Sequence, residues 1–243
     1  MGEIVRLDKY LTDMGIGTRS EVKNYIRKGR VQVNGHVIKE SDTKINTTNT
    51  QVMFDNKLLQ YEEFVYYMLN KPAGVVSATI DNLSTTVVEL IKEAKNKEIF
   101  PVGRLDKDTE GLLLLTNDGD LSHQLLSPKK HVEKVYYAKV KGYVTQDDVL
   151  LFKKGIKIND EFTTLPAKLN IIQSDEISEI ELTIYEGKFH QVKRMFIAVG
   201  KEVIYLKRLS MGSVRLDENL ALGEYRRLNE DEINSLKNSE KSI

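Results

Sequence analysis

The beginning of the chain has a pattern of apolar and polar positions that predicts two helices followed by a hairpin. Apolar residues recur at spacings of four and three over residues 7–14, which is the period of one helical face. Thr18, with Glu21 three residues later, is the capping-box pattern that begins a second helix, and Gly29 ends it. Residues 31–38 alternate around a central Asn-Gly, the strongest short signal for a β-hairpin. These elements together predict a compact N-terminal domain.

After a turn-rich linker, expected near residues 56–63, the pattern changes. A continuous apolar run at 64–69 predicts a buried strand, and the spacing from Asn229 to Glu232 predicts the start of a last helix. Between them, strands are expected at 112–116, 133–143, 165–172, 177–185 and 203–209, and helices at 84–94, 120–126, 145–153 and 188–199. Strands and helices mix without regular alternation, so the fold class is predicted to be α+β. We expect a small α/β domain at residues 1–60 and a second domain at 61–243 with a mostly antiparallel mixed sheet flanked by helices.

The charge of the chain is balanced overall but not locally. There are 36 Lys and Arg residues against 36 Asp and Glu, so binding to nucleic acid would need local basic patches. One such patch is predicted on the second helix, where Arg19, Lys23 and Arg27 are spaced by four and share a face. The same pattern is typical of an ordinary solvated helix surface, and the spacing alone leaves both interpretations open.

Composition narrows the class of protein further. The chain has no Cys, which excludes disulfides and thiolate metal sites and fits a reducing cytosol. It shows no apolar signal core at its N-terminus and no apolar run long enough to span a bilayer, so a cytoplasmic protein is expected. The four His residues lack ligand spacing, and neither a P-loop nor a dinucleotide fingerprint occurs. We therefore expect neither a metal nor a cofactor.

The densest polar stretch, residues 103–111, lies directly before an apolar strand. Asp106, Asp108 and Glu110 have the spacing of the first half of an EF-hand loop. The twelfth position of that loop should be a bidentate Glu, and here it is Asn117, which excludes the calcium interpretation. A glycosidase, which needs two carboxylates around one bond, stays open as an alternative. The aromatic content of 7%, without Trp, offers little surface for stacking on sugars.

Two further segments are candidates for a site. Tyr136 lies in an alternating strand pattern, where one of two neighbouring tyrosines faces the core and the other faces away. Gly187 permits a tight turn before the helix predicted at 188–199. Lys193 and Arg194 lie off the apolar stripe of that helix. On pattern alone, an ordinary amphipathic helix with two surface cations explains this segment as well as a binding site does.

The chain resembles a known family over nearly its whole length. Residues 5–38 resemble the S4-type RNA-binding domain, and residues 64–233 resemble the catalytic domain of the pseudouridine synthases, in particular the group that acts on the small ribosomal subunit. Four segments carry the resemblance: Asn70-Lys71-Pro72-Ala73-Gly74, Gly103-Arg104-Leu105-Asp106 with Thr109 and Gly111-Leu112, Glu133-Lys134-Val135-Tyr136, and His190-Gln191-Val192-Lys193-Arg194-Met195-Phe196. Together, and in this order, they are specific.

The resemblance implies a reaction and roles for particular residues. A uridine of ribosomal RNA would be isomerised to pseudouridine without redox change or hydrolysis, so no cofactor is needed. Asp106 would be the nucleophile or the electrostatic partner of the ribose, and Lys193, with Arg194 as second candidate, would keep its carboxylate ionised. Tyr136 would stack on the flipped uracil and is a candidate acceptor for the proton at carbon five. Arg104 would fill the position that the base vacates.

The resemblance also implies the substrate. The pair His190-Gln191, in place of the Arg-Glu of large-subunit relatives, favours a uridine in 16S over 23S ribosomal RNA. Contacts with RNA are expected from Arg104, Arg194, His190 and Gln191, and in the N-terminal domain from Arg6, Lys9, Arg19, Lys23 and Arg27. The expected partner is ribosomal RNA or an assembling small subunit, and the expected form is a monomer. The alternative is a non-catalytic RNA-binding protein of ribosome assembly. Loss of Asp106 or Tyr136 would indicate such a protein, and both residues are present.

Overall fold

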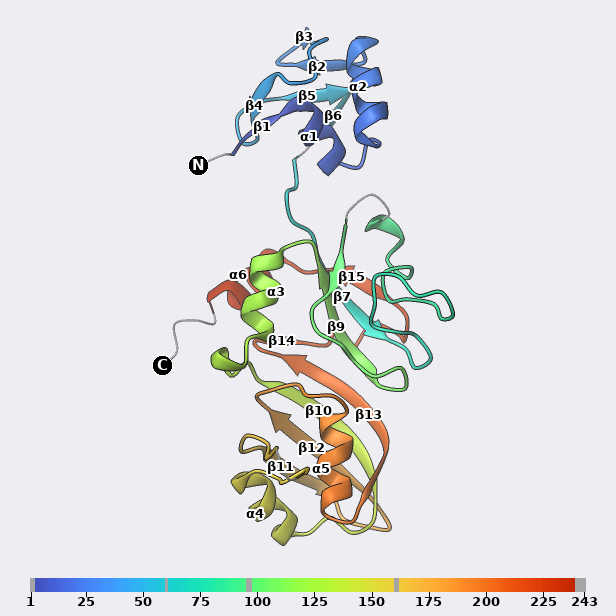
Figure 1. Cartoon of the computed structure of the whole chain (residues 1–243), viewed down its shortest axis with the longest axis vertical. Coiled ribbons are helices and arrows are strands. Elements are labelled where there is room, and N and C mark those ends of the chain that lie inside the picture. The colour runs from blue at the N-terminus through green and yellow to red at the C-terminus, as the bar shows by residue number, and fades with distance from the viewer. Residues whose placement is uncertain (1–2, 60, 95–97, 160–161, 239–243) are drawn as a thin grey trace. The chain divides into compact units, whose positions relative to one another are not determined.

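The computed structural model describes residues 3–59, 61–94, 98–159 and 162–238 and divides the chain into two compact units (Figure 1). The smaller unit runs to Val65 and includes 91–99, and the larger contains 66–90 and the chain from Phe100 onward. Among the described residues, no helix combines the length and apolar character needed to cross a membrane.

The smaller unit packs two helices against short strands. Its four-stranded sheet has the order β3-β2-β5-β6, and β1 pairs separately with β4. The elements are β1 (Ile4–Arg6), α1 (Leu7–Asp13), α2 (Arg19–Arg27), β2 (Val31–Val33), β3 (His36–Val37), β4 (Lys44–Asn46), β5 (Val52–Phe54) and β6 (Lys57–Leu59). Helix α2 begins at the predicted capping box, in which the Thr18 amide donates to a Glu21 carboxylate oxygen at 2.8 Å. Leu7 and Leu11 are fully buried, so the helical stripe predicted over residues 7–14 is confirmed, and Val22 and Ile26 of α2 join the same core.

Two hairpins build the four-stranded sheet. Asn34 and Gly35 connect β2 to β3 with φ angles of 49° and 80°, the left-handed values that a tight hairpin turn requires. Asp55 and Asn56 connect β5 to β6 in the same way, with φ angles of 48° and 61°. The prediction of a linker from residue 56 was therefore wrong over 57–59, because the Asp-Asn turn closes a hairpin and β6 belongs to the sheet.

The larger unit is built on one long mixed sheet with the order β11-β12-β10-β13-β9-β7-β15, to which β8 and β14 add short pairs. Its strand ladders in the described ranges are antiparallel except for β9 with β13, which is parallel. The strands are β7 (Tyr66–Lys71), β8 (Phe100–Pro101), β9 (Glu110–Thr116), β10 (Lys134–Lys141), β11 (Lys168–Gln173), β12 (Ile177–Ile184), β13 (Glu202–Met211), β14 (Val214–Arg215) and β15 (Tyr225–Arg227). The prediction of an α+β fold with a mostly antiparallel mixed sheet is confirmed.

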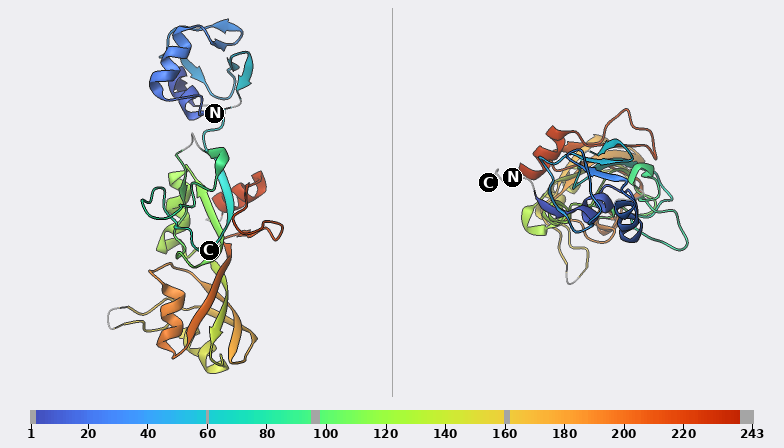
Figure 2. Two further views of the ribbon diagram at one scale, coloured as in Figure 1. Left: turned by 90° about the vertical axis from the view of Figure 1, so that its right-hand side faces the viewer. Right: turned by 90° about the horizontal axis from the view of Figure 1, so that it is seen from above.

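Helices flank both halves of this sheet (Figures 1 and 2). They are α3 (Gly119–Leu126) and α6 (Glu230–Asn238) at the half that contains β7 and β9, and α4 (Gln146–Lys154) and α5 (Gln191–Ala198) at the half that contains β10 to β13. Of the two 3₁₀ turns in the described residues, η2 (Pro128–Lys130) belongs to this unit and η1 (Lys92–Ala94) to the smaller one. Helix α6 begins where the predicted capping box lies, since Asn229 and Glu232 exchange hydrogen bonds of 2.9 Å. The apolar core between β7, β9, α3 and α6 includes Met68, Leu112 and Leu114.

The prediction of a helix at 84–94 was wrong. Over its described residues this segment is a series of bends and turns that ends in η1. Thr86 is fully buried and forms a bridge with Val76, while Glu89 accepts hydrogen bonds from the amide and the hydroxyl of Thr86. Thr86 and Glu89 make hydrogen bonds typical of a helix cap, but the backbone of Thr86 pairs with Val76 and turns follow in place of a helix.

Candidate active site

Asp106 lies in the loop that leads into β9, and hydrogen bonds fix the backbone on both sides of it. The amide of Thr109 donates to the carbonyl of Asp106 at 3.0 Å, which closes a turn. The buried hydroxyl of Ser77 accepts from the amide of Leu105 at 3.1 Å and donates to the Leu105 carbonyl at 2.9 Å. The position of the Asp106 side chain is thus determined by a strand entrance and by a segment about thirty residues earlier in the chain.

Lys71, at the end of β7, fastens the same loop from the protein interior. Its side chain is fully buried, and its ammonium donates to the carbonyls of Pro72, Lys107 and Thr109 at 3.0, 3.2 and 2.8 Å. Burial lowers the pKa of Lys71 to about 8, although nearby carboxylates, Asp108 first among them, oppose that shift. The sequence placed Lys71 in a recognisable motif but assigned it no role, because its three partners are backbone carbonyls that no side-chain pattern reveals.

Gly111 brings β9 close to β13. Its φ is +98°, and a Cβ atom at this position would lie 2.3 Å from the carbonyl oxygen of Arg208. Arg208 faces Gly111 in the parallel pair and Tyr136 in the neighbouring antiparallel pair. Only glycine allows this approach, and through it the loop of Asp106 reaches the strand of Tyr136.

Two side chains from the start of α5 lie beside Asp106. The Lys193 ammonium is 3.4 Å from one carboxylate oxygen, and Nε2 of His190 is 3.5 Å from the other. Lys193 binds Asp108 more closely, at 2.7 and 2.8 Å to its two oxygens, and this hydrogen bond is the main cause of the lowered pKa of Asp108. Of the two candidate cations it is Lys193 that approaches Asp106, while Arg194 donates to a backbone carbonyl of its own helix turn.

The turn before α5 is held by its own side chains. His190 has a φ of 48°, so the left-handed residue of the turn is His190. Gln191 is buried, accepts from the amide of Lys188 at 2.9 Å and donates to Glu186 at 3.1 Å. Both ends of the Gln191 amide serve the turn, and its direct contact with RNA stays a prediction.

Asp106, Tyr136 and Lys193 line the same small cavity, with a volume of about 60 Å³. Tyr136 is only 7% exposed, and the hydroxyl of Thr109, also in the cavity wall, has no hydrogen-bond partner among the described residues. A cavity of this size holds a few water molecules, so a nucleobase enters only if side chains move.

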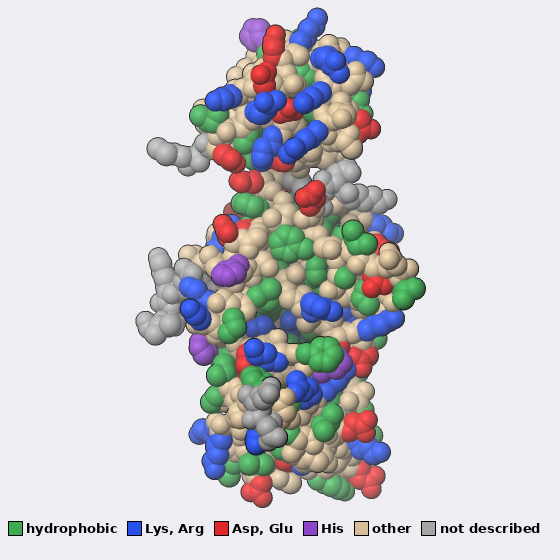
Figure 3. All heavy atoms as spheres, in the orientation of Figure 1, with side chains coloured by type: hydrophobic (Ala, Val, Ile, Leu, Met, Phe, Trp, Pro, Cys, Tyr) green, Lys and Arg blue, Asp and Glu red, His purple; other side chains and the backbone are tan. Residues whose placement is uncertain are grey.

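A second, larger cavity of about 540 Å³ adjoins the small one and shares part of its wall with it. The shared residues are Arg104, Leu105, Asp106, Gly187, Lys188 and His190. Arg104 is exposed at this border. On the face shown in Figure 3, Lys and Arg side chains gather across the middle of the larger unit, a distribution that suits a polyanionic ligand.

In the smaller unit, the predicted RNA-contacting residues fall into two groups. Arg6 makes a two-point ion pair with Asp8 at 3.0 and 2.8 Å, and Lys9 pairs with Asp13 at 2.7 Å. The cations on α2 are exposed, namely Arg19, Lys23 and Arg27. Figure 3 shows Lys and Arg side chains over much of this face of the smaller unit.

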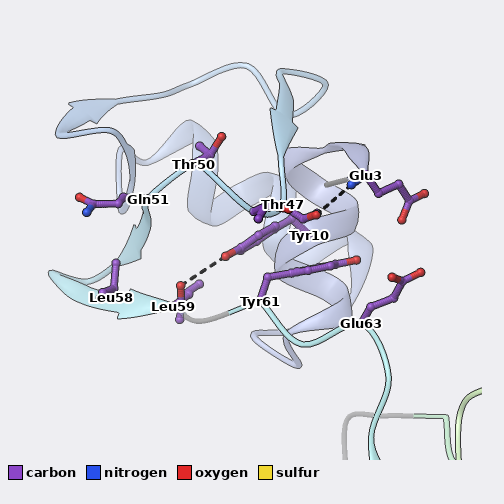
Figure 4. Close-up of a pocket in the computed structure, with 10 residues that line it drawn as sticks. Glu3, Tyr10, Thr47, Thr50, Gln51, Leu58, Leu59, Tyr61 and Glu63 are labelled. Carbon is purple, nitrogen blue, oxygen red and sulfur yellow. Dashed lines mark hydrogen bonds between the residues drawn. The ribbon is translucent and has the colours of Figure 1, made fainter. Parts of the chain in front are cut away.

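The smaller unit also has an open recess of about 840 Å³, which is not lined by those cations (Figure 4). The rings of Tyr10 and Tyr61 stack in it at 4.8 Å, and the Tyr10 hydroxyl donates to the Leu59 carbonyl at 3.3 Å. Glu3 and Glu63 lie at its edge. Two carboxylates repel phosphate, so this recess does not extend the basic face.

Comparison with known proteins agrees with the fold. Residues 65–198 match the model of the RNA pseudouridylate synthase family, and residues 5–50 match the S4 domain. The chain belongs to the RNA pseudouridine synthase family and carries an S4 domain. The predicted family membership and the prediction that the protein is an enzyme of this type are confirmed.

Similar proteins cover nearly the whole chain. It is 49% identical to an uncharacterized RNA pseudouridine synthase of Bacillus subtilis, over 96% of this chain and 98% of that protein. It is 41% identical to ribosomal small subunit pseudouridine synthase A of Salmonella typhimurium, over 96% and 100%, and 39% identical to ribosomal large subunit pseudouridine synthase B of Bacillus subtilis, over 96% and 95%. A crystal structure of a pseudouridylate synthase matches with a TM-score of 0.67 at 39% identity, covering 96% of this chain and 99% of that one.

Proposed function

We propose that this enzyme isomerises one uridine of 16S ribosomal RNA to pseudouridine, with Asp106 as its catalytic carboxylate. The observation that carries the proposal is the convergence on one small cavity of Asp106 from the loop before β9, Tyr136 from β10 and Lys193 from α5. A carboxylate can balance the charge on the ribose, an aromatic ring can stack on the base, and these groups suit the breaking and remaking of a glycosidic bond.

The proposed reaction is an isomerisation, so its atoms balance without a second substrate. The bond from nitrogen one of uracil to the ribose breaks and the base turns. Carbon five then forms the new bond to the ribose and loses its proton, and nitrogen one takes up a proton. Asp106 attacks the ribose or stabilises the positive charge that grows on it, and the Lys193 ammonium lies 3.4 Å from one of its carboxylate oxygens. Tyr136 stacks on the detached uracil and its hydroxyl is the candidate acceptor of the proton.

The target base must leave its stack to reach Asp106, which costs a few kcal/mol. Stacking on Tyr136 returns roughly 1–3 kcal/mol, enough to offset much of that cost. Arg104, exposed at the border of the two cavities, is placed to occupy the gap in the RNA. Residues 1–60 form the RNA-holding domain in this scheme and 61–243 the catalytic domain. The exposed cations of α2 contact phosphates, which position RNA without reading its sequence.

The relatives support 16S over 23S ribosomal RNA only narrowly, at 41% against 39% identity. The His190-Gln191 pair adds to the 16S assignment, and 23S ribosomal RNA is the second candidate. In this proposal the enzyme acts in the cytoplasm, as a monomer, on ribosomal RNA or on an assembling small subunit.

Release of tritium from carbon five of uracil tests the proposal. Transcripts of 16S and 23S ribosomal RNA, and small-subunit assembly particles, would be labelled and incubated with the enzyme. We expect release from 16S RNA, free or in particles, with one modified position on mapping and no loss of base or strand. Release from 23S RNA alone would move the substrate to the large subunit. Binding without release from any of these RNAs would favour the non-catalytic protein, and loss of a base the glycosidase.

A further inference from the structure

Phe189 is a large apolar side chain that the fold holds out toward solvent. It lies between β12 and α5 and is 76% exposed, although its neighbours in the chain are tightly bonded. It lies in the wall of the 540 Å³ cavity that also contains Asp106. A phenyl ring left in water forgoes the stabilisation that burial would give, and at the rim of the active site it is available to a ligand.

The ring is held in a defined orientation. It stacks on the imidazole of His190 with ring centres 3.8 Å apart and planes 18° from parallel. Its backbone carbonyl accepts from the Arg194 guanidinium at 3.4 Å, and the Lys188 carbonyl accepts from the Gln191 amide at 3.0 Å. One face of the ring is therefore covered by His190, and the high exposure leaves the other open.

The surroundings of the open face are cationic. Arg104, Lys107 and Lys188 are exposed and line the same cavity as Phe189. A flat aromatic face beside several cations is the combination that binds single-stranded nucleic acid, because the base stacks while the cations neutralise the phosphates. A volume of about 540 Å³ is within the range of sites that enclose a small ligand.

We propose that Phe189 is a stacking platform for a nucleobase next to the target uridine, so that base, Phe189 and His190 form one stack beside Asp106. This inference rests on the proposed function. His190 links the platform to the chemistry, since its Nε2 is 3.5 Å from Asp106. Occupation of the platform would fix the ribose of the target against the catalytic carboxylate.

The test compares Phe189→Ala, Phe189→Leu and Phe189→Tyr with the natural enzyme. Kinetics of tritium release from the ribosomal RNA transcript that proves active would be measured. We expect Phe189→Ala and Phe189→Leu to raise KM about 5- to 150-fold, the range for one stacked base, with kcat changed much less. Phe189→Tyr keeps a planar ring and should retain natural KM. Tyr143→Ala is the matched control, since Tyr143 is also an exposed ring, at 57%, and lies outside both cavities.

A second readout does not depend on turnover. A single-stranded fragment containing the mapped uridine would carry 2-aminopurine on its 5′ or 3′ side, and stacking on the ring would quench its fluorescence. Quenching by the natural enzyme at one of the two sides, lost in Phe189→Ala and kept in Tyr143→Ala, supports the platform. Natural KM and quenching in Phe189→Leu, with an active natural enzyme, would overturn it, because apolar bulk would then suffice. A changed kcat and pH profile with unchanged KM would also overturn it and leave Phe189 a support for His190. An inactive natural enzyme would instead refute the proposed function.

Discussion

Replacing Asp106 by Asn is expected to separate catalysis from folding. Asn has the same shape, and the turn around residue 106 uses the backbone carbonyl, which the substitution keeps. The lost charge interaction is with Lys193 at 3.4 Å, between side chains that are 22% and 24% exposed. Partly exposed pairs of this kind contribute at most about 1 kcal/mol. Lys193 also keeps Asp108, at 2.7 Å, so no charge is left without a partner.

These values predict a melting temperature within about 2–4 °C of the natural enzyme. Catalysis should behave differently, because an amide can neither attack the ribose nor balance its positive charge. Loss of a nucleophile from an intact site costs about 10⁴-fold or more in turnover, equivalent to roughly 5.5 kcal/mol of transition-state stabilisation. We therefore expect Asp106→Asn to fold, to bind RNA with natural affinity and to release no detectable tritium.

Thermal unfolding, RNA binding and tritium release on the same preparations check this prediction. Asp108→Asn is the control, since its side chain is 72% exposed and its amide oxygen can still accept from Lys193. That variant should stay within about tenfold of natural turnover. Turnover above about 1% in Asp106→Asn, or equal losses in the two variants, would refute the assignment of Asp106 as the catalytic carboxylate.

Three further predictions follow from particular contacts. Gly111→Ala places a Cβ atom 2.3 Å from the Arg208 carbonyl oxygen at a φ of +98°, so we expect the free energy of unfolding, measured in urea, to fall by about 3 kcal/mol or more. Gly119→Ala is the control: its Cβ atom would meet no atom within 4 Å, and the free energy of unfolding should change by less than about 1 kcal/mol. Burial lowers the pKa of Lys71 from 10.5 to about 8, so between these pH values the unfolded chain binds more protons than the folded one. The free energy of unfolding of the natural enzyme should therefore rise with pH across this range more steeply than that of Lys71→Met. Equal pH slopes in the two proteins would contradict that pKa. The third prediction concerns a variant in which Arg19, Lys23 and Arg27 are all replaced by Ala. Each phosphate contact contributes about one unit to the slope of log binding constant against log salt concentration, so this variant should bind RNA more weakly and with a slope about three units shallower. An unchanged slope would exclude phosphate contacts from these three residues.

The local pattern predicted most of the elements because short-range energetics decide them. The capping box at Thr18, the Asn34-Gly35 turn and the cap at Asn229 lie where expected, since each is closed by bonds between residues that are near in the chain. The prediction of a helix at 84–94 was wrong because a contact outside that segment decides its structure. Its cap-like Thr86 is buried and its backbone pairs with Val76, so a contact with a residue outside the predicted helix overrides a weak local preference.

The sequence by itself determined the family, the α+β class and the identity of Asp106 as the candidate carboxylate, because motifs and apolar periods are written in residue order. Only the tertiary structure decided which groups meet at that carboxylate. It brought Lys193, not Arg194, to Asp106 and made Lys71 a clamp of the loop. It also turned Phe189 outward beside the site. These choices depend on distances between segments far apart in the chain, set by the close pairing of β9 with β13 at Gly111, and no spacing in the sequence encodes such distances.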